Sequence, residues 1–383
     1  MRVKSTVLIG AMAAAAMFIP GCNADTGRDK AYTRVAEREI LEHIEPVVVS
    51  SSNNDTATAA DKDVRISDNP EVHAVIQARD RIGNEIYFSD IETALIEGKK
   101  VQRPFTDGWQ LPILQWDASK YGPIEINWFE IRSQNGFYNN TVPRQSHIAY
   151  TQVPAGKGWS FKPELGTHRY KITVSYASRK LDSGEEIAAG KNGKIKGAGR
   201  ISVRENDDLP GQMTAWANLP YIYGSSDEQV ELYIGGDCAD IITGALHRMG
   251  RTSFPYTYSQ GFERFGDVVF RGYINMQGHF LDRNKRESQS LDIRRGDLLV
   301  YNKPQHHVAV FYNGLNKSGD PIQVVHSYDG KGVHRDILYS GSVLAQPDNL
   351  FKHFSEIFLG KNHNTLQSPV DNRLDTVEVI RLR

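Results

Sequence analysis

The amino-acid sequence predicts an α+β protein in which a β-rich region precedes a region with a helix and further strands. Between residues 70 and 210, short runs of alternating apolar and polar side chains are separated by turn-forming residues, as in antiparallel sheets. A polar, turn-prone segment at 206–211 ends this region. Beyond it, apolar residues recur at helical spacing from Ile241 to Met249, and strand-like apolar runs follow.

The chain begins with a basic head and an alanine-rich apolar run over residues 7–19. This run is shorter than the ~20 apolar residues of a membrane-spanning helix, and the pattern is typical of a secretory signal. It ends at Ile19-Pro20-Gly21-Cys22, which resembles a bacterial lipobox. The resemblance implies a lipoprotein signal peptide over 1–22 and a lipid on Cys22 that anchors the protein in the bacterial cell envelope, facing the periplasm or at the outer membrane. The alternative is an ordinary cleaved signal with an incidental cysteine.

Cysteine usage and charge narrow the classes of function. The sequence has two cysteines, so a lipid on Cys22 leaves Cys238 as the sole thiol, without an internal disulfide. A lone thiol in an oxidising compartment is a liability unless it is buried or has a function. The formal net charge is -1 and the sequence has no basic block, which disfavours nucleic-acid binding. No cofactor and no metal ion are expected.

Residues 23–69 are polar, with a run of serines, asparagines and aspartate at 50–55. Such a composition predicts a flexible tether that lifts the body of the protein off the membrane. The alternative is that part of this span belongs to a folded domain, because Val47-Val48-Val49 is apolar.

Residues 70–210 predict a β-sandwich-like accessory domain or a related barrel. The stretches 124–131, 170–176 and 200–204 alternate between apolar and polar residues, and turn-rich segments separate them. Three tryptophans of this region either pack inside it or bind a glycan or peptide: Trp109, Trp116 and Trp159.

Cys238 follows two glycines and precedes the predicted helix. The apolar residues of the helix lie on one face, and Gly250 is placed to end it. Cys238 is therefore expected at the helix N-terminus, where unpaired N–H groups and the helix dipole lower the pKa of a thiol. The same N–H groups are suited to hold a developing oxyanion. The alternative is a small, buried structural cysteine.

Two predicted strands beyond Cys238 carry histidines. His306 and His307 begin an apolar run, and His326 lies near the end of the run 323–328. A cysteine followed by strand-borne histidines suits a Cys–His pair whose imidazole is oriented by a third polar group. The histidine takes the thiol proton and later gives it to the leaving amine. Successive strand residues point to opposite faces, so only one of His306 and His307 meets Cys238.

Together these residues resemble the NlpC-type papain-like peptidases of bacterial cell walls. The resemblance covers roughly residues 219–332, and it rests on the order and approximate spacing of five short motifs. The motifs are Pro220-Tyr221-Ile222-Tyr223-Gly224, Asp237-Cys238, Gly296-Asp297-Leu298-Leu299, His307-Val308-Ala309-Val310 and Val325-His326.

The resemblance implies that residues 211–383 form a papain-like α+β hydrolase domain. It also implies hydrolysis of amide bonds in peptidoglycan stem peptides, typically between D-glutamate and the diamino acid, through a thioester on the enzyme. Residue by residue, Cys238 is then the nucleophile, His307 the base and His326 its orienting partner. Tyr221 and Asp237 are expected to contact the substrate, which is peptidoglycan or its muropeptides. The family register favours His307 over His306 as the base.

The sequence also departs from the family pattern. Ala239-Asp240 stands where a serine and a glycine usually follow the cysteine, which affects the substrate site. The span from Gly250 to Gly296 is long and resembles an insertion that reshapes or covers the cleft. Asp237 and Asp297 are also suited to plain turn or cap chemistry.

Three other functions stay open. A transglutaminase-like acyl transferase or another papain-like amidase would use an aspartate as the third residue, and Asp329 is available for it. A metal site would combine His306, His307, His326 and Asp297, although no tight ligand spacing such as His-x-x-x-His is present. A non-catalytic envelope-binding lipoprotein would use its aromatic β-rich region instead.

Overall fold

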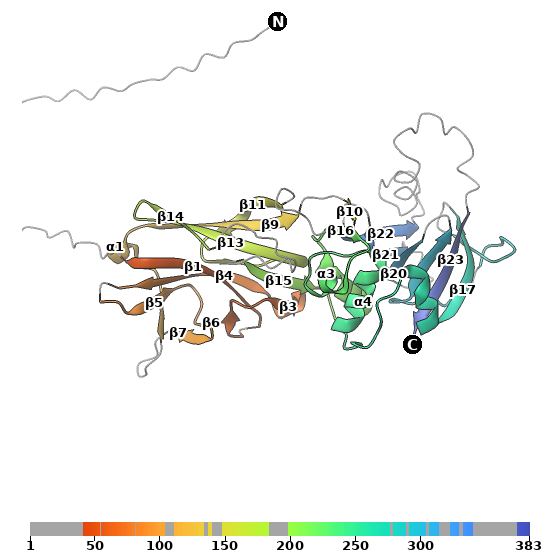
Figure 1. The fold of residues 1–383 in the computed structure, drawn as a ribbon, viewed down its shortest axis with the longest axis horizontal. Helices are drawn as coiled ribbons and strands as arrows, with labels where there is room; N and C mark the ends of the chain where they lie inside the picture. The colour runs from red at the N-terminus through yellow and green to blue at the C-terminus, as the bar shows by residue number, and fades with distance from the viewer. Residues whose placement is uncertain are drawn as a thin grey trace, which may run out of the picture. The chain divides into compact units, whose positions relative to one another are not determined.

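The computed structural model describes residues 41–53, 55–80, 82–103, 111–133, 137–139, 148–183, 198–275, 279–288, 291–303, 306–313, 322–328, 332–339 and 374–383. Residues Arg38–Arg383 form one compact unit (Figure 1). The predicted signal peptide and Cys22 lie outside the described residues. Within the described part of the chain, no helix is both long and apolar enough to cross a membrane.

The first sheet closes on itself into a seven-stranded barrel. Its strands, in order around the ring, are β1 (Glu42–Ser51), β2 (Ala57–Thr58), β6 (Thr93–Ile96), β7 (Lys99–Gln102), β8 (Leu111–Leu114), β5 (Glu85–Phe88) and β4 (Glu71–Arg79). The ring closes because β1 pairs with both β2 and β4. The short strand β12 (Ser160–Phe161) adds to the free side of β4.

A second sheet packs against the outer face of β1 and β4. Its strands are β11 (Ile148–Lys157), β9 (Ile124–Ser133), β13 (Gly166–Tyr176), β15 (Gly199–Arg204) and β3 (Lys62–Arg65), with β14 (Arg179–Asp182) paired to β13. The two faces of β1 serve different cores. Val49 lies in the barrel core, whereas its neighbour Val48 packs with Trp128 and Ile172 of the second sheet.

One expectation for this region is wrong. The span 42–65, expected to belong to a flexible tether, instead supplies β1, β2 and β3. Val48 and Val49 are buried in β1, so the alternative of a folded segment holds there. Of the two architectures expected for the accessory region, a sandwich or a related barrel, the structure contains a closed barrel.

The aromatic residues of this region pack inside it. The Trp116 ring makes edge contacts with Phe88 and Tyr176, and its indole N–H donates to the Gly122 carbonyl at 2.9 Å. Trp159 packs against the same core. Trp109 lies outside the described residues.

The third sheet belongs to the C-terminal half. Its strands, in order across the sheet, are β18 (Phe280–Leu281), β17 (Gly266–Asn275), β23 (Leu374–Leu382), β19 (Leu298–Lys303), β20 (His307–Phe311), β21 (Ile322–Tyr328) and β22 (Gly332–Tyr339). All of its pairings are antiparallel. The expected insertion at 250–296 is therefore part of the fold, because it supplies β17 and β18.

The third sheet has two buried faces. Val308, Val310 and Val325 lie on the face that packs against the helices, which we call the helix face. Ala309 and Phe311 lie on the opposite face with Tyr301 and Val324, which we call the inner face. Successive side chains of β20 point to opposite faces, which produces this division. Every residue of the strand is buried, so both faces are covered.

Short helices cover the helix face. They are α2 (Leu209–Met213), η3 (Thr214–Trp216), α3 (Asp227–Glu231), α4 (Cys238–Arg248) and η4 (Ser259–Phe265). The remaining elements are η1 (Ile66–Asp68), α1 (Ala118–Tyr121), and the parallel pair β10 (Phe137–Asn139) and β16 (Tyr221–Tyr223). The protein is thus mostly β, and the expected papain-like α+β fold class is wrong. Sequence patterns found the helix at α4 but underestimated how much of the surrounding chain is strand.

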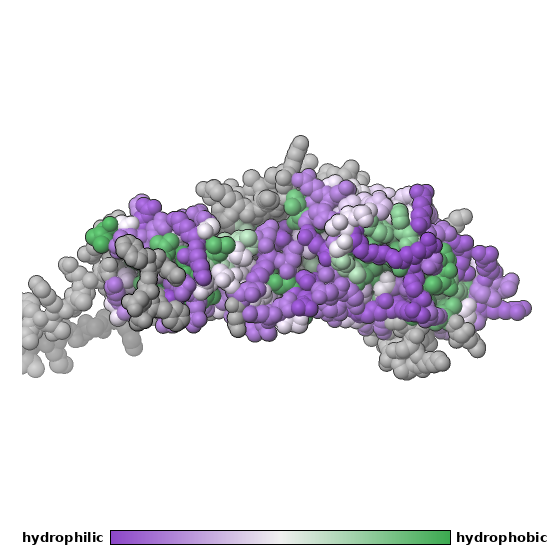
Figure 2. Space-filling view, turned by 90° about the horizontal axis from the view of Figure 1, so that it is seen from below, coloured by the Kyte–Doolittle hydropathy of each residue, from purple (hydrophilic) through white to green (hydrophobic). Residues whose placement is uncertain are grey.

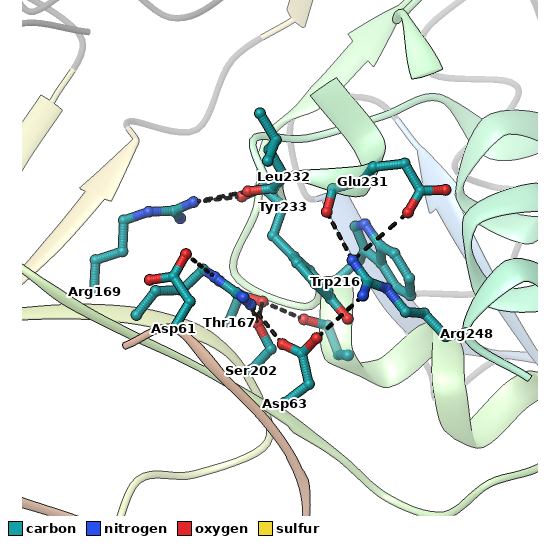
Figure 3. Close-up of polar contacts among 12 residues, drawn as sticks. Asp61, Asp63, Thr167, Arg169, Ser202, Trp216, Glu231, Leu232, Tyr233 and Arg248 are labelled. Carbon is teal, nitrogen blue, oxygen red and sulfur yellow. Dashed lines mark hydrogen bonds and ion pairs between the residues drawn. The ribbon is translucent and has the colours of Figure 1, made fainter. Parts of the chain in front are cut away.

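Polar contacts join the second sheet to the C-terminal half (Figure 3). Arg169 of β13 donates to the carbonyls of Leu232 and Tyr233 at 3.3 and 2.8 Å. The Tyr233 ring lies near the guanidinium groups of Arg200 and Arg248, at 4.6 and 5.0 Å from the ring centroid. Burial lowers the pKa of Arg169 to about 10. These partly buried contacts connect β13 and β15 to Tyr233 and to α4.

Hydrophilic residues dominate the face of the molecule shown in Figure 2. Large apolar side chains that are exposed include Ile82, Tyr223 and Tyr258. Single exposed apolar residues are normal for a folded protein. Tyr223, which is 57% exposed, is the one that lies close in sequence to the site described next.

Candidate functional site

Cys238 is the first residue of α4, as the sequence predicts. Asp237 is the N-cap, with φ −85° and ψ −177°, and its carboxylate accepts from the N–H groups of Ala239 and Asp240 at 2.9 and 3.0 Å. The Cys238 side chain is 8% exposed. Asp237 therefore acts as a helix cap and occupies two of the N–H groups that were expected to hold an oxyanion.

Helix α4 ends close to where the sequence predicts. Gly250 has φ +90°, and its N–H donates to the His247 carbonyl at 2.9 Å. A positive φ favours glycine at this position. Ile241, Ile242 and the alanine and leucine that follow are buried, but Met249 is 39% exposed because it is the C-cap.

Two glycines allow the chain to reach α4 through a crowded space. Gly235 has φ +156°, and a Cβ there would lie 2.5 Å from the Pro220 carbonyl oxygen. A Cβ on Gly236 would lie 2.8 Å from the Ile241 side chain. The Gly-Gly pair before the cysteine thus serves close packing rather than flexibility.

Tyr221 lies beside this turn. It is buried in β16, and its backbone forms a parallel bridge with Gly236, two residues before Cys238. Ser327 of β21 donates its hydroxyl to the Gly236 carbonyl at 3.1 Å. The chain before Cys238 is therefore held from both sides, by β16 and by β21.

Asp237 and Asp240 form a half-buried carboxyl pair next to the thiol. Ser225 donates its hydroxyl to Asp240 at 2.6 Å and accepts from the Asp237 N–H at 3.1 Å. Burial, and then the charge of Asp237, raise the pKa of Asp240 to about 7. Burial also raises the pKa of Asp237. The sequence showed Asp240 only as a departure from the family pattern and gave no signal for Ser225.

The two predicted histidines meet. His307 is the first residue of β20 and His326 lies on β21, at 2% and 0% exposure. His307 Nε2 lies 3.0 Å from His326 Nδ1, and the rings are nearly perpendicular at 80°. The predicted pairing of a base with an orienting histidine is therefore geometrically present.

The thiol and this histidine pair belong to different faces of the third sheet. Cys238 packs with the residues of the helix face, and the amide of Val308 lies close enough to lower its pKa. The His307 ring lies near Tyr301 of the inner face, with 6.2 Å between ring centroids. Alternation along the strand then places His306 on the side of Val308, where its ring accepts a hydrogen bond from Gln260.

The net effect of this environment is to raise the pKa of Cys238. Burial is the main cause and the charge of Asp237 is the second, while the Val308 amide lowers it by less. The prediction of a lowered pKa is wrong. A helix terminus contributes about 0.3–1 kcal/mol, whereas full burial shifts a pKa by up to about 3–5 units, so burial wins.

Asp297 has a structural role. It is buried, and its carboxylate accepts from Arg381 Nε and Nη2 at 3.0 and 2.8 Å and from the Arg294 N–H at 2.9 Å. Turn and ion-pair chemistry therefore accounts for this residue. Within the described part of the chain, no group of three or more His, Cys, Asp and Glu side chains is placed to bind a metal ion. Asp329, the alternative third residue, lies outside that part.

Comparison with known protein families, with curated proteins and with solved structures finds no match for this chain.

Proposed function

We propose that the chain is a cysteine hydrolase of the bacterial cell envelope that cleaves amide bonds in peptidoglycan stem peptides. The observation that carries this proposal is Cys238 at the start of α4, beside the amide of Val308, which directly follows His307. The His307–His326 hydrogen bond supplies a base with an oriented ring. The sequence motifs that resemble NlpC-type peptidases support the same chemistry.

In the proposed reaction, the Cys238 thiol gives its proton to His307, and its sulfur attacks the amide carbonyl. The C–N bond breaks as the histidine returns the proton to the leaving amine, and a thioester remains. Water then hydrolyses the thioester, with the same histidine as base. The proton transfer takes place at the start of β20, where His307 directly precedes Val308, whose amide lies beside the thiol.

The charges around the thiol favour a particular leaving group. Asp237 and Asp240 place two carboxyl groups next to Cys238. A diamino acid carries an extra amino group that such carboxylates attract. We therefore propose the bond between D-glutamate and the diamino acid as the one cleaved, with Tyr221 and Asp237 shaping the site. A lipid on Cys22 would hold the enzyme at the membrane.

Purified muropeptides test this proposal. We expect wild-type protein to release the expected fragments, detected by mass spectrometry, and Cys238→Ala to release none. Cys238→Ala removes a buried side chain, so circular dichroism should first confirm that it folds. The absence of cleavage by the wild type, or equal cleavage by both proteins, would refute the proposal.

A second candidate is a non-catalytic envelope-binding lipoprotein. Two observations favour it: burial raises the pKa of Cys238, and the His307 ring lies on the other face of the sheet. The rate of iodoacetamide labelling at neutral pH separates the candidates. Cys238 labelling that speeds up when muropeptides are added supports the hydrolase, and an inert thiol under both conditions supports the binding protein.

A further inference from the structure

A second polar cluster lies at one end of the first barrel, far in sequence from Cys238. Ser51 is the last residue of β1, His73 lies on β4, and Asp90 follows β5. Ser51 Oγ lies 2.9 Å from His73 Nε2, and His73 Nδ1 lies 3.2 Å from Asp90 Oδ1. The three side chains thus form a continuous Ser–His–Asp chain of hydrogen bonds.

The barrel topology explains why they meet. His73 stands opposite Val49 in the pairing of β4 with β1, and Val49 points into the barrel core. Ser51 is two residues from Val49 and therefore lies on the same face. Strand β4 pairs with both β1 and β5, so the three side chains come from neighbouring strands of the ring.

The partners of His73 fix the orientation of its imidazole. Asp90 also accepts the Ser160 hydroxyl at 2.6 Å. Burial raises the pKa of Asp90, but hydrogen bonds from His73 and Ser160 outweigh it, so the pKa is lowered and the carboxylate stays charged. The tautomer with its hydrogen on Nδ1 donates to Asp90, and its Nε2 then accepts from the Ser51 hydroxyl, which is the arrangement that a general base requires.

The cluster lines a cavity of about 590 Å³, within the range of ligand pockets. Four carboxylates and one lysine are among its lining residues: Asp55, Glu71, Asp90, Glu92 and Lys162. The excess of negative charge repels anionic ligands. Polar lining of this kind suits a neutral or amino-bearing ligand with hydroxyl groups.

We propose that Ser51, His73 and Asp90 form a second hydrolytic site, which cleaves short acyl esters of neutral or amino-bearing sugars. Ser51 Oγ attacks the ester carbonyl as His73 takes its proton. The ester C–O bond breaks, and His73 gives the proton to the leaving sugar hydroxyl, which leaves an acyl-serine. Water, deprotonated by His73, then releases the acid and restores Ser51. Asp90 and Ser160 are positioning residues for the imidazole.

An activity-based probe tests this site independently of Cys238. The full chain is incubated with a neutral fluorophosphonate, and the modified residue is located by peptide mass spectrometry. We expect stoichiometric labelling at Ser51 in both wild type and Cys238→Ala. Ser51→Ala should abolish the labelling. The matched control Ser50→Ala removes a hydroxyl from the adjacent residue, which alternation directs to the other face of β1, and should leave the labelling unchanged.

The base and its orientation are tested by rate. His73→Gln should slow labelling at Ser51 by about 100-fold or more, since general bases contribute about 10²–10⁴-fold, and Asp90→Asn should slow it substantially. Both variants should also lose hydrolysis of p-nitrophenyl acetate, while circular dichroism and thermal unfolding confirm that they fold. A wild type that is not labelled at Ser51, or equal labelling rates in folded His73→Gln, would overturn the proposal and reduce the cluster to a set of structural hydrogen bonds.

Discussion

Replacing Asp240 by asparagine should stabilise the protein at alkaline pH and not at acid pH. Asparagine has the same shape and can still accept the Ser225 hydroxyl through its amide oxygen. It removes one of the two half-buried carboxyl groups at the start of α4. The pKa of Asp240 is raised from 3.8 to about 7, so the charged form is disfavoured in the folded state.

The magnitude follows from linkage. A carboxyl whose pKa is higher in the folded state binds its proton more tightly there, so its contribution is fully present below pH ~4 and is lost as the pH rises through ~7. About three pH units at about 1.4 kcal/mol each give an upper limit near 4 kcal/mol. Because Asp237 shares the proton and asparagine also loses hydration, we expect about 2 kcal/mol of stabilisation at pH 8.

Urea unfolding of wild type and Asp240→Asn at pH 3 and pH 8 measures this difference. The gain should be close to zero at pH 3, below the unfolded pKa of about 3.8, and about 2 kcal/mol at pH 8. Glu228→Gln, which neutralises an exposed carboxyl of α3, should change stability by less than about 0.5 kcal/mol at either pH. A gain that is equal at both pH values, or a loss at pH 8, would refute the reasoning.

Three further predictions concern the packing at Gly244, the contacts of the Tyr233 ring and the identity of the base. Gly244→Ala should destabilise by about 1–3 kcal/mol in urea, although alanine favours helices, because its Cβ would lie 2.5 Å from Val230 Cγ1. Tyr233→Leu should cost about 2–3 kcal/mol, because it loses two guanidinium contacts and an aromatic stack, whereas Tyr233→Phe should cost less than about 1 kcal/mol. His307→Gln should abolish muropeptide cleavage, whereas His306→Gln should retain much of it. The reverse result would identify His306 as the base.

Strands with regular alternation were predictable from the sequence. The stretches expected at 124–131, 170–176 and 200–204 lie within β9, β13 and β15. Closure of the barrel was not predictable, because it depends on pairing between β1 and two other strands rather than on any local pattern. The serines at the end of β1 were predicted to belong to a tether, because the polar mouth of a barrel and a polar linker have similar compositions.

The site shows the same division between local and non-local information. The position of Cys238 at a helix start is local, since a cap and helical spacing define it, and the structure confirms it. The meeting of His307 with His326 follows from their places on adjacent strands. The pKa of the thiol was mispredicted because burial by residues distant in sequence outweighs the local helix dipole.

The carboxyl pair connects the Asp240 prediction to the proposed chemistry. Both Asp237 and Asp240 raise the pKa of Cys238 by their negative charge, in addition to burial. Neutralising these carboxyl groups therefore makes the thiol easier to ionise, although burial still opposes ionisation. An amino group of the substrate would partly neutralise both carboxylates, and Asp240→Asn removes the charge of one. Asp240→Asn should therefore speed iodoacetamide labelling of Cys238 at pH 8, and an unchanged rate would show that the charge of Asp240 does not control ionisation of the thiol.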